Sequence, residues 1–151
     1  MSIVTEKFFN YKSFFIEQIN RIAKLTPPGC NFERGLERSM FLREYRTIII
    51  NMGRMSGKTT GLLQLAAELI GNGGSRVIVM NPANKRHVQG MIPYHHRDGI
   101  RISVLSELSD RCENVKFLLV DESEFTLSNR RAREEVYDWA SRNGVEFVIM
   151  T

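Results

Sequence analysis

Residues Asn51–Thr60 carry the side chains with the clearest chemistry in this chain. They read N-M-G-R-M-S-G-K-T-T, after the apolar run Thr47–Ile50 and before the helix-forming stretch Leu62–Leu69. In a strand, glycine-rich turn and helix of this kind, the backbone N–H groups and the helix dipole face an anion. The sequence therefore predicts a phosphate-binding loop, although Met52 stands where the general pattern has glycine. The alternative is an ordinary strand–turn–helix connection.

Two side chains of this loop would act directly on a nucleoside triphosphate. Lys58 would place a cation at the β- and γ-phosphates, and the hydroxyl of Thr59 would reach Mg²⁺. The expected ligands are therefore ATP and Mg²⁺. The predicted nucleotide contacts are Gly53, Arg54, Met55, Ser56, Gly57, Lys58, Thr59 and Thr60.

A second group of polar residues ends a buried-strand pattern. Val115–Glu122 reads V-K-F-L-L-V-D-E. In a parallel sheet, carboxylates at the carboxyl end of such a strand lie beside the phosphate loop. Asp121 would hold Mg²⁺, and Glu122 could orient and deprotonate an attacking water. The pair favours hydrolysis over transfer to a bound acceptor, and the alternative is two solvated acids.

Length and composition limit the remaining possibilities. The 151 residues suffice for one domain, and 42% hydrophobic with 25% charged residues is ordinary for a globular protein. No apolar run has the length of a membrane span. Cys30 and Cys112 give neither a disulfide framework nor metal spacing, so a cytoplasmic location is expected. A net charge of +4 permits nucleic-acid contact without demanding it.

The periodicity of the chain predicts five strands that alternate with helices. The strands are Thr47–Ile50, Arg76–Met80, Ile100–Leu105, Val115–Val120 and Glu146–Thr151. Helices are expected over Leu36–Arg43, Leu62–Leu69, Pro82–Gln89 and Ser128–Arg142, with a helical turn in Ser106–Cys112. An amphipathic helix near the N-terminus carries its apolar face on Phe8, Tyr11, Phe15, Ile19 and Ile22.

This order predicts an α/β fold, a mostly parallel five-stranded sheet flanked by helices. With the phosphate loop it corresponds to a P-loop NTPase. We expect one domain over residues 1–151, with an N-terminal helical segment (1–46) and a nucleotide-binding core (47–151).

Several of these motifs resemble those of a known family. Arg54–Thr59 looks like the phosphate loop of the large terminase subunits of tailed bacteriophages, the ATPases that pump DNA into procapsids. Leu118–Glu122 matches the acidic strand of that family, and Val148–Thr151 is similar to the start of its coupling motif. Val79–Pro82 is similar to the segment that follows the nucleotide helix in terminases and related helicases. The resemblance implies the additional-strand class of P-loop ATPases.

The resemblance also implies roles and partners. Arg54 would be a cis arginine that reaches the γ-phosphate, and Thr151 would sense the γ-phosphate. The partners would be double-stranded DNA and either further copies in a ring or packaging components such as the portal, in the host cytoplasm and without a membrane. Chains of that family continue well beyond the coupling motif, so the activity of the isolated chain stays open.

Weaker signals concern nucleic-acid contacts. Lys85, Arg86 and His87 are the first candidates, because related motors touch nucleic acid with the segment after the second strand. A cluster of Arg130, Arg131 and Arg133 could be solvated, contact the DNA backbone or act as a trans arginine finger. The run His95–Asp98 reads as a solvated loop rather than a metal site.

Three other functions compete with the packaging ATPase. They are a helicase or recombination ATPase, a non-catalytic module that nucleotide binding orders for assembly, and, last, a small-molecule kinase.

Overall fold

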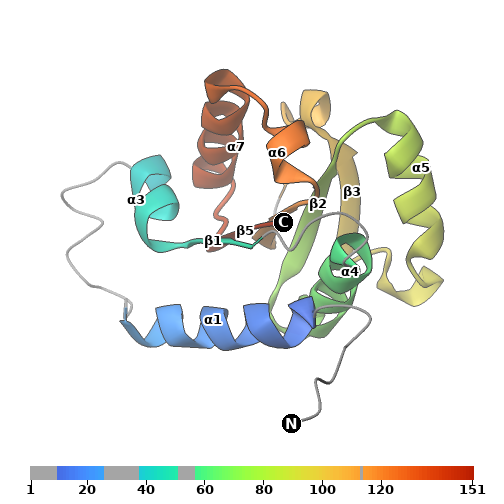
Figure 1. The fold of residues 1–151 in the computed structure, drawn as a ribbon, viewed down its shortest axis with the longest axis horizontal. Coiled ribbons are helices and arrows are strands. Elements are labelled where there is room, and N and C mark those ends of the chain that lie inside the picture. The colour runs from blue at the N-terminus through green and yellow to red at the C-terminus, as the bar shows by residue number, and fades with distance from the viewer. Residues whose placement is uncertain (1–9, 26–37, 51–56, 113) are drawn as a thin grey trace, which may run out of the picture.

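The computed structural model describes residues 10–25, 38–50, 57–112 and 114–151 (Figure 1). Its strands are β1 (Thr47–Ile49), β2 (Gly74–Val79), β3 (Ile100–Val104), β4 (Val115–Val120) and β5 (Phe147–Met150). Its helices are α1 (Tyr11–Leu25), α3 (Arg38–Tyr45), α4 (Lys58–Leu69), α5 (Pro82–Met91), α6 (Ser123–Thr126) and α7 (Arg130–Arg142). The short 3-10 turns are η1 (Ile70–Asn72), η2 (Tyr94–His96) and η3 (Leu105–Glu107).

The five strands form one parallel sheet in the order β1-β5-β4-β2-β3. The predicted five-stranded α/β sheet is therefore confirmed, and every described strand pair is parallel. Strand β5 lies between β1 and β4, so one strand separates the end of β1 from the acids that follow β4. All carboxyl ends lie at the same edge, where ligands of open α/β sheets bind.

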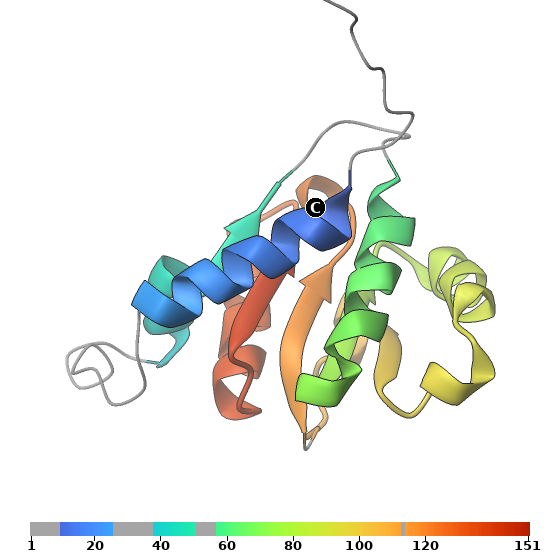
Figure 2. The ribbon, with the colours of Figure 1, turned by 90° about the horizontal axis from the view of Figure 1, so that it is seen from below.

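Helices cover both faces of the sheet. α1 and α4 lie side by side over one face, as Figure 2 shows, and α5 packs on the same side. α3 and α7 cover the opposite face (Figure 1). The side chains of β4 alternate accordingly, because Phe117 and Leu119 point to the first cluster while Leu118 and Val120 point to the second.

The N-terminal amphipathic helix is confirmed as α1, and it packs on α4, the helix that follows the predicted phosphate loop. Tyr11, Phe15 and Ile19 are buried in the same cluster as Leu62 of α4. The two helices approach so closely that a Cβ atom on Gly61 would lie 2.6 Å from the Cβ of Tyr11. Phe8, which the sequence places on the same apolar face, lies outside the described residues.

Two helices begin where asparagine caps them. Asn81 accepts a hydrogen bond from the backbone N–H of Asn84 (2.9 Å), and Pro82 occupies the first turn of α5. Asn129 accepts from the N–H of Ala132 (2.8 Å) and begins α7.

Some predicted bounds were wrong by a few residues. The last helix starts at Arg130 instead of Ser128, because Asn129 caps it, and the short helix α6 precedes it. The helical turn expected in Ser106–Cys112 is the 3-10 turn η3.

A fully buried arginine in β2 was not expected from an apolar strand pattern. Arg76 donates to Asp110 (2.7 Å) and Ser103 (2.9 Å), and its guanidinium lies 4.8 Å from the Trp139 ring centroid. A buried charge is tolerated only when it is paired and hydrogen-bonded, and Arg76 meets that condition. The network joins β2, β3 and α7 below the carboxyl edge.

Candidate functional site

The candidate site lies at the carboxyl edge, where α4 begins directly after Gly57. Gly57 precedes the helix with φ of 82°, a left-handed conformation that glycine adopts at little cost. Its carbonyl accepts the first described helical hydrogen bond, from Gly61 N–H (2.8 Å). Lys58 and Thr59 are therefore the first residues of α4. The other predicted loop contacts, Gly53, Arg54, Met55 and Ser56, lie outside the described residues.

Asp121 forms the centre of a hydrogen-bonded group from three elements. It is 5% exposed, and its backbone N–H donates to the carbonyl of Ile78 (2.9 Å). The hydroxyl of Thr59 donates to Oδ2 (2.7 Å), and the hydroxyl of Thr151 lies 3.4 Å from Oδ1. Thr59 at the start of α4 and Thr151 after β5 thus both contact the carboxylate that follows β4. Thr60, in contrast, is exposed and makes none of these contacts.

Lys58 and Glu122 form an ion pair beside this group. Lys58 Nζ lies 3.0 Å from Glu122 Oε2, and the side chains are 4% and 28% exposed. The Lys58 ammonium and the Glu122 carboxylate, two of the predicted catalytic groups, therefore neutralise each other in this structure. A site that holds a buried ammonium against a carboxylate can exchange the carboxylate for another anion, such as a phosphate.

The backbone at Glu122 is in the left-handed region, with φ of 49°. That conformation is uncommon for a non-glycine residue and costs about 1–3 kcal/mol, so the surrounding contacts must hold it. The N–H of Ser123 donates to the carbonyl of Thr151 (2.7 Å), and Thr126 Oγ1 donates to the carbonyl of Asp121 (2.7 Å). These bonds turn the chain into α6 and fix the acid pair. The sequence analysis missed Thr126 in this role.

Burial raises the pKa of Asp121 above its ordinary value. The negative charge of Glu122 raises the pKa further, while the hydrogen bonds from Thr59 and Thr151 and the charge of Lys58 oppose the increase. The carboxylate is thus destabilised by loss of water. A nearby cation would remove that penalty.

This shift predicts a pH-dependent stability difference for Asp121→Asn. Because the folded pKa exceeds the unfolded pKa, the folded state binds more protons between the two values, and stability falls as pH rises through that window. At pH 7 we expect the asparagine variant to be more stable than the wild type, with a difference that narrows as the pH is lowered toward 4. Urea denaturation at several pH values without nucleotide measures this, and the exposed Asp138→Asn serves as the control. A constant difference would contradict the assignment.

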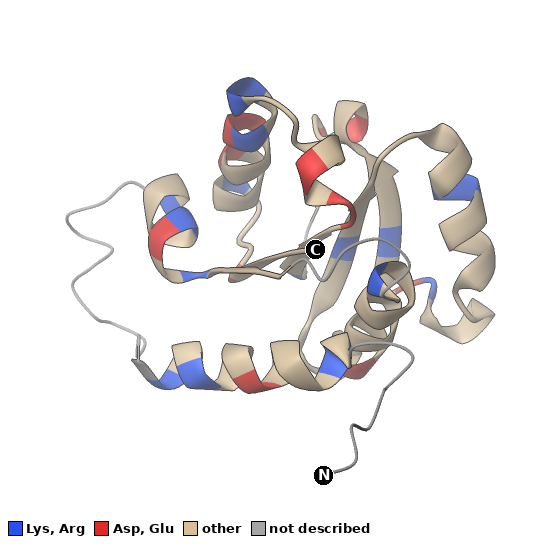
Figure 3. Ribbon diagram, in the orientation of Figure 1, with Lys and Arg blue, Asp and Glu red and all other residues tan. Residues whose placement is uncertain are grey.

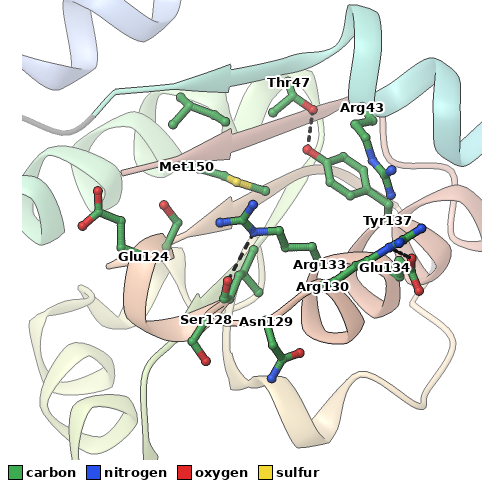
Figure 4. Close-up of a pocket in the computed structure, with 13 residues that line it drawn as sticks. Arg43, Thr47, Glu124, Ser128, Asn129, Arg130, Arg133, Glu134, Tyr137 and Met150 are labelled. Atoms are coloured by element: carbon green, nitrogen blue, oxygen red, sulfur yellow. Dashed lines mark hydrogen bonds and ion pairs between the residues drawn. The ribbon is translucent and has the colours of Figure 1, made fainter.

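A cavity of about 740 Å³ lies on the side of α3 and α7, and it is lined by neither Asp121 nor Glu122 (Figure 4). Arg43 lies over the ring of Tyr137 (5.0 Å), whose hydroxyl is 2.8 Å from Thr47 Oγ1. Arg133 extends into the cavity and donates to the carbonyl of Leu127 (3.3 Å). Ser123 and Met150 also line it, and each directly precedes or follows a residue of the candidate site in the chain.

Two of the three clustered arginines form ion pairs within α7, Arg130 with Glu134 (2.8 Å) and Arg131 with Glu135 (3.3 Å). Arg130 and Arg133 both line the cavity. Of the other candidate cations, Lys85 forms an ion pair with Glu107 (2.9 Å), while Arg86 and His87 are exposed. No helix in the described part of the chain is long and apolar enough to cross a membrane.

Comparison with known proteins identifies the fold. No family model matches the sequence, and no curated protein matches it. Among solved structures, the UvsW helicase from bacteriophage T4 is similar, with a TM-score of 0.54 and 13% identity over 94% of this chain and 70% of that chain. Together with the parallel sheet, this likeness confirms the predicted α/β fold, a parallel five-stranded sheet flanked by helices. The terminase resemblance stays a prediction.

Proposed function

We propose that this protein is a magnesium-dependent ATPase that acts on nucleic acid. The observation that carries the proposal is the convergence of α4 and β4. Thr59 bonds to Asp121 at 2.7 Å, and Lys58 pairs with Glu122 at 3.0 Å. A hydroxyl and a carboxylate in contact, beside a buried ammonium and a second carboxylate, are the parts that phosphoryl transfer to water requires.

The residues present fit a magnesium ion. Thr59 and Asp121 offer hard oxygen donors, which Mg²⁺ prefers, and the raised pKa of Asp121 reflects a buried charge that a cation would stabilise. When bound, Mg²⁺ would neutralise charge on the phosphate oxygens. Thr59 and Asp121 are the residues that would hold it.

The chain's own groups would divide the remaining work. Lys58 would bind the phosphates after leaving Glu122, and that exchange would free the Glu122 carboxylate to orient a water and accept its proton. Thr151, whose hydroxyl lies beside Asp121, would respond to the γ-phosphate. Arg54 would contribute a cis cation, as the resemblance implies.

The finer assignment is a DNA-packaging motor of the terminase type. Its support is the resemblance of the phosphate loop, the acidic strand and the segment Val148–Thr151. If it is correct, the partners would be double-stranded DNA and either further copies in a ring or the portal, and the location would be the host cytoplasm. The second candidate is a helicase-type ATPase. The fold likeness to a phage helicase favours it, because the likeness covers 94% of this chain. A nucleotide-ordered assembly module without turnover is the third candidate.

Single-turnover ATP hydrolysis tests these assignments. We expect Mg²⁺-dependent phosphate release that duplex DNA accelerates for a packaging motor, and that single-stranded DNA accelerates for a helicase. Nucleotide binding without phosphate release in any of these reactions would favour the assembly module. An absence of nucleotide binding would contradict the proposal itself.

Lys58→Ala should weaken ATP binding. Hydrogen bonds to charged groups contribute about 1.5–3 kcal/mol, so we expect at least about a tenfold higher Kd. Calorimetry with a nonhydrolysable analogue measures the change. Lys116→Ala is the matched control, because Lys116 lies near the start of β4, at the opposite end of the strand from Asp121. Equal binding by both variants would show that Lys58 does not contact the phosphates.

A further inference from the structure

A second surface with a distinct chemistry lies along α5 and β3, at the edge of the sheet opposite β1. The segment Arg86–Arg101 contains three arginines, three histidines and one acid, Asp98. Figure 3 shows basic residues on α5 and in the turn that follows it. The basic bias of the chain is thus partly concentrated on this flank.

Tyr94 is the most exposed large aromatic side chain of the described residues, at 85%. Its backbone is nevertheless held in place. Pro93 precedes it, the His96 N–H donates to the Pro93 carbonyl (2.9 Å), and the Arg97 N–H donates to the Tyr94 carbonyl (3.2 Å). A tyrosine that buries so little surface contributes little to folding, while the turn presents its ring to solvent.

Arginines accompany this ring. The Arg97 guanidinium lies 5.5 Å from the Tyr94 ring centroid, and Arg97 also lines a cavity of about 360 Å³ between α5 and β3. Arg101 lines the same cavity and is fixed by Asp110 (3.1 Å). The cavity wall is completed by Gln89, Gly90, Ile92, Ile100 and Ile102.

We propose that the Tyr94 surface, formed by Tyr94, Arg97 and Arg101, binds single-stranded nucleic acid. This inference rests on the proposed function, and within it on the helicase-type candidate and not on the duplex-packaging one, and it names the partner and the contact surface. A base would stack on the exposed ring of Tyr94, and the guanidiniums would contact the adjoining phosphates. Bases of a duplex are stacked on one another and do not offer their faces to a ring, so the surface fits an unpaired strand.

The other basic groups are less suited to this role. Lys85, Arg130 and Arg131 pair with Glu107, Glu134 and Glu135, as Arg101 pairs with Asp110, so the distinction rests on Arg97. Arg97, in contrast, faces an aromatic ring, and the only acid in its segment is Asp98. The Tyr94 surface therefore combines a cation with an accessible aromatic face.

Fluorescence anisotropy of the full chain with labelled oligothymidine tests the proposal. We expect Tyr94→Ala to raise Kd about tenfold, because base stacking on one aromatic ring has that order of effect. Tyr94→Phe keeps the ring and should bind within about twofold of the wild type. Arg97→Ala should reduce the slope of log Kd against log salt by about 0.7, and Arg142→Ala on α7 should not change it.

Three further measurements separate the outcomes. Basal ATP hydrolysis and the melting temperature of Tyr94→Ala should match the wild type. An equal loss of binding to duplex DNA or polyglutamate would overturn the stacking assignment and indicate a general polyanion site. Unchanged oligothymidine binding by Tyr94→Ala would overturn the inference alone, since nucleotide hydrolysis would still stand. Failure of the wild type to bind any nucleic acid would overturn the partner assigned in the proposed function as well.

Discussion

Glu122→Gln should lower ATP turnover by about 10²–10⁴-fold and leave nucleotide binding intact. Loss of a positioned general base accounts for a rate decrease of this size. The ion pair adds a second expectation. In the wild type, ATP must compete with the Glu122 carboxylate for Lys58, at 3.0 Å. A neutral amide holds the ammonium less strongly, so the variant should bind ATP at least as tightly as the wild type.

Calorimetry with a nonhydrolysable analogue and single-turnover phosphate release would measure the two effects separately. Glu68→Gln is a suitable control, because Glu68 is exposed on α4 and the substitution changes the charge by the same amount. If Glu122→Gln lost ATP binding, Glu122 would have a structural task instead. The left-handed backbone at Glu122 makes glutamine preferable to a smaller residue, since the substitution retains the length of the side chain.

Arg76→Ala should cause the largest loss of stability, about 3–5 kcal/mol. The substitution leaves Asp110 without its closest cation, removes the bond to Ser103 and opens a void against Trp139. Arg101 also contacts Asp110, at 3.1 Å, so the loss should fall toward the lower end of that range.

Urea denaturation followed by tryptophan fluorescence measures this loss. Arg130→Ala is the control, because its exposed pair with Glu134 should contribute less than about 1 kcal/mol. Equal stability of the two variants would show that the buried network is replaceable. A pH series gives an independent check. The hydrogen bond from Arg76 lowers the pKa of Asp110, so its stabilisation is present above the unfolded pKa and is lost as pH falls through the folded value.

The strands were predictable because each is a short apolar run with a local boundary. Parallel order followed from the alternation of strands and helices. The position of β5 between β1 and β4 did not follow from the local pattern, because pairing partners far apart in sequence leave no periodic signal. The caps at Asn81 and Asn129 are local signals, and both helices begin beside them.

The candidate site was predictable as a set of residues but not as a geometry. Gly-Lys-Thr and Asp-Glu identify Lys58, Thr59, Asp121 and Glu122 by type and spacing. The pairing of Lys58 with Glu122 depends on the backbone turn at Glu122, for which the sequence gives no glycine or other signal. The burial of Arg76 was not predicted for a related reason. A charged residue in an apolar strand can be buried only where partners such as Asp110 and Trp139 surround it, and these lie far from Arg76 in the sequence.

The close approach of Gly61 and Tyr11 has a practical consequence for truncation. A chain that started at Thr47 would lack Tyr11, Phe15 and Ile19, which pack against α4. The apolar face of α4, including Leu62, would then be exposed to water. Such an exposed face invites aggregation. The first helix therefore belongs to the same packed core as α4, and the predicted boundary between residues 1–46 and 47–151 is not a suitable truncation site.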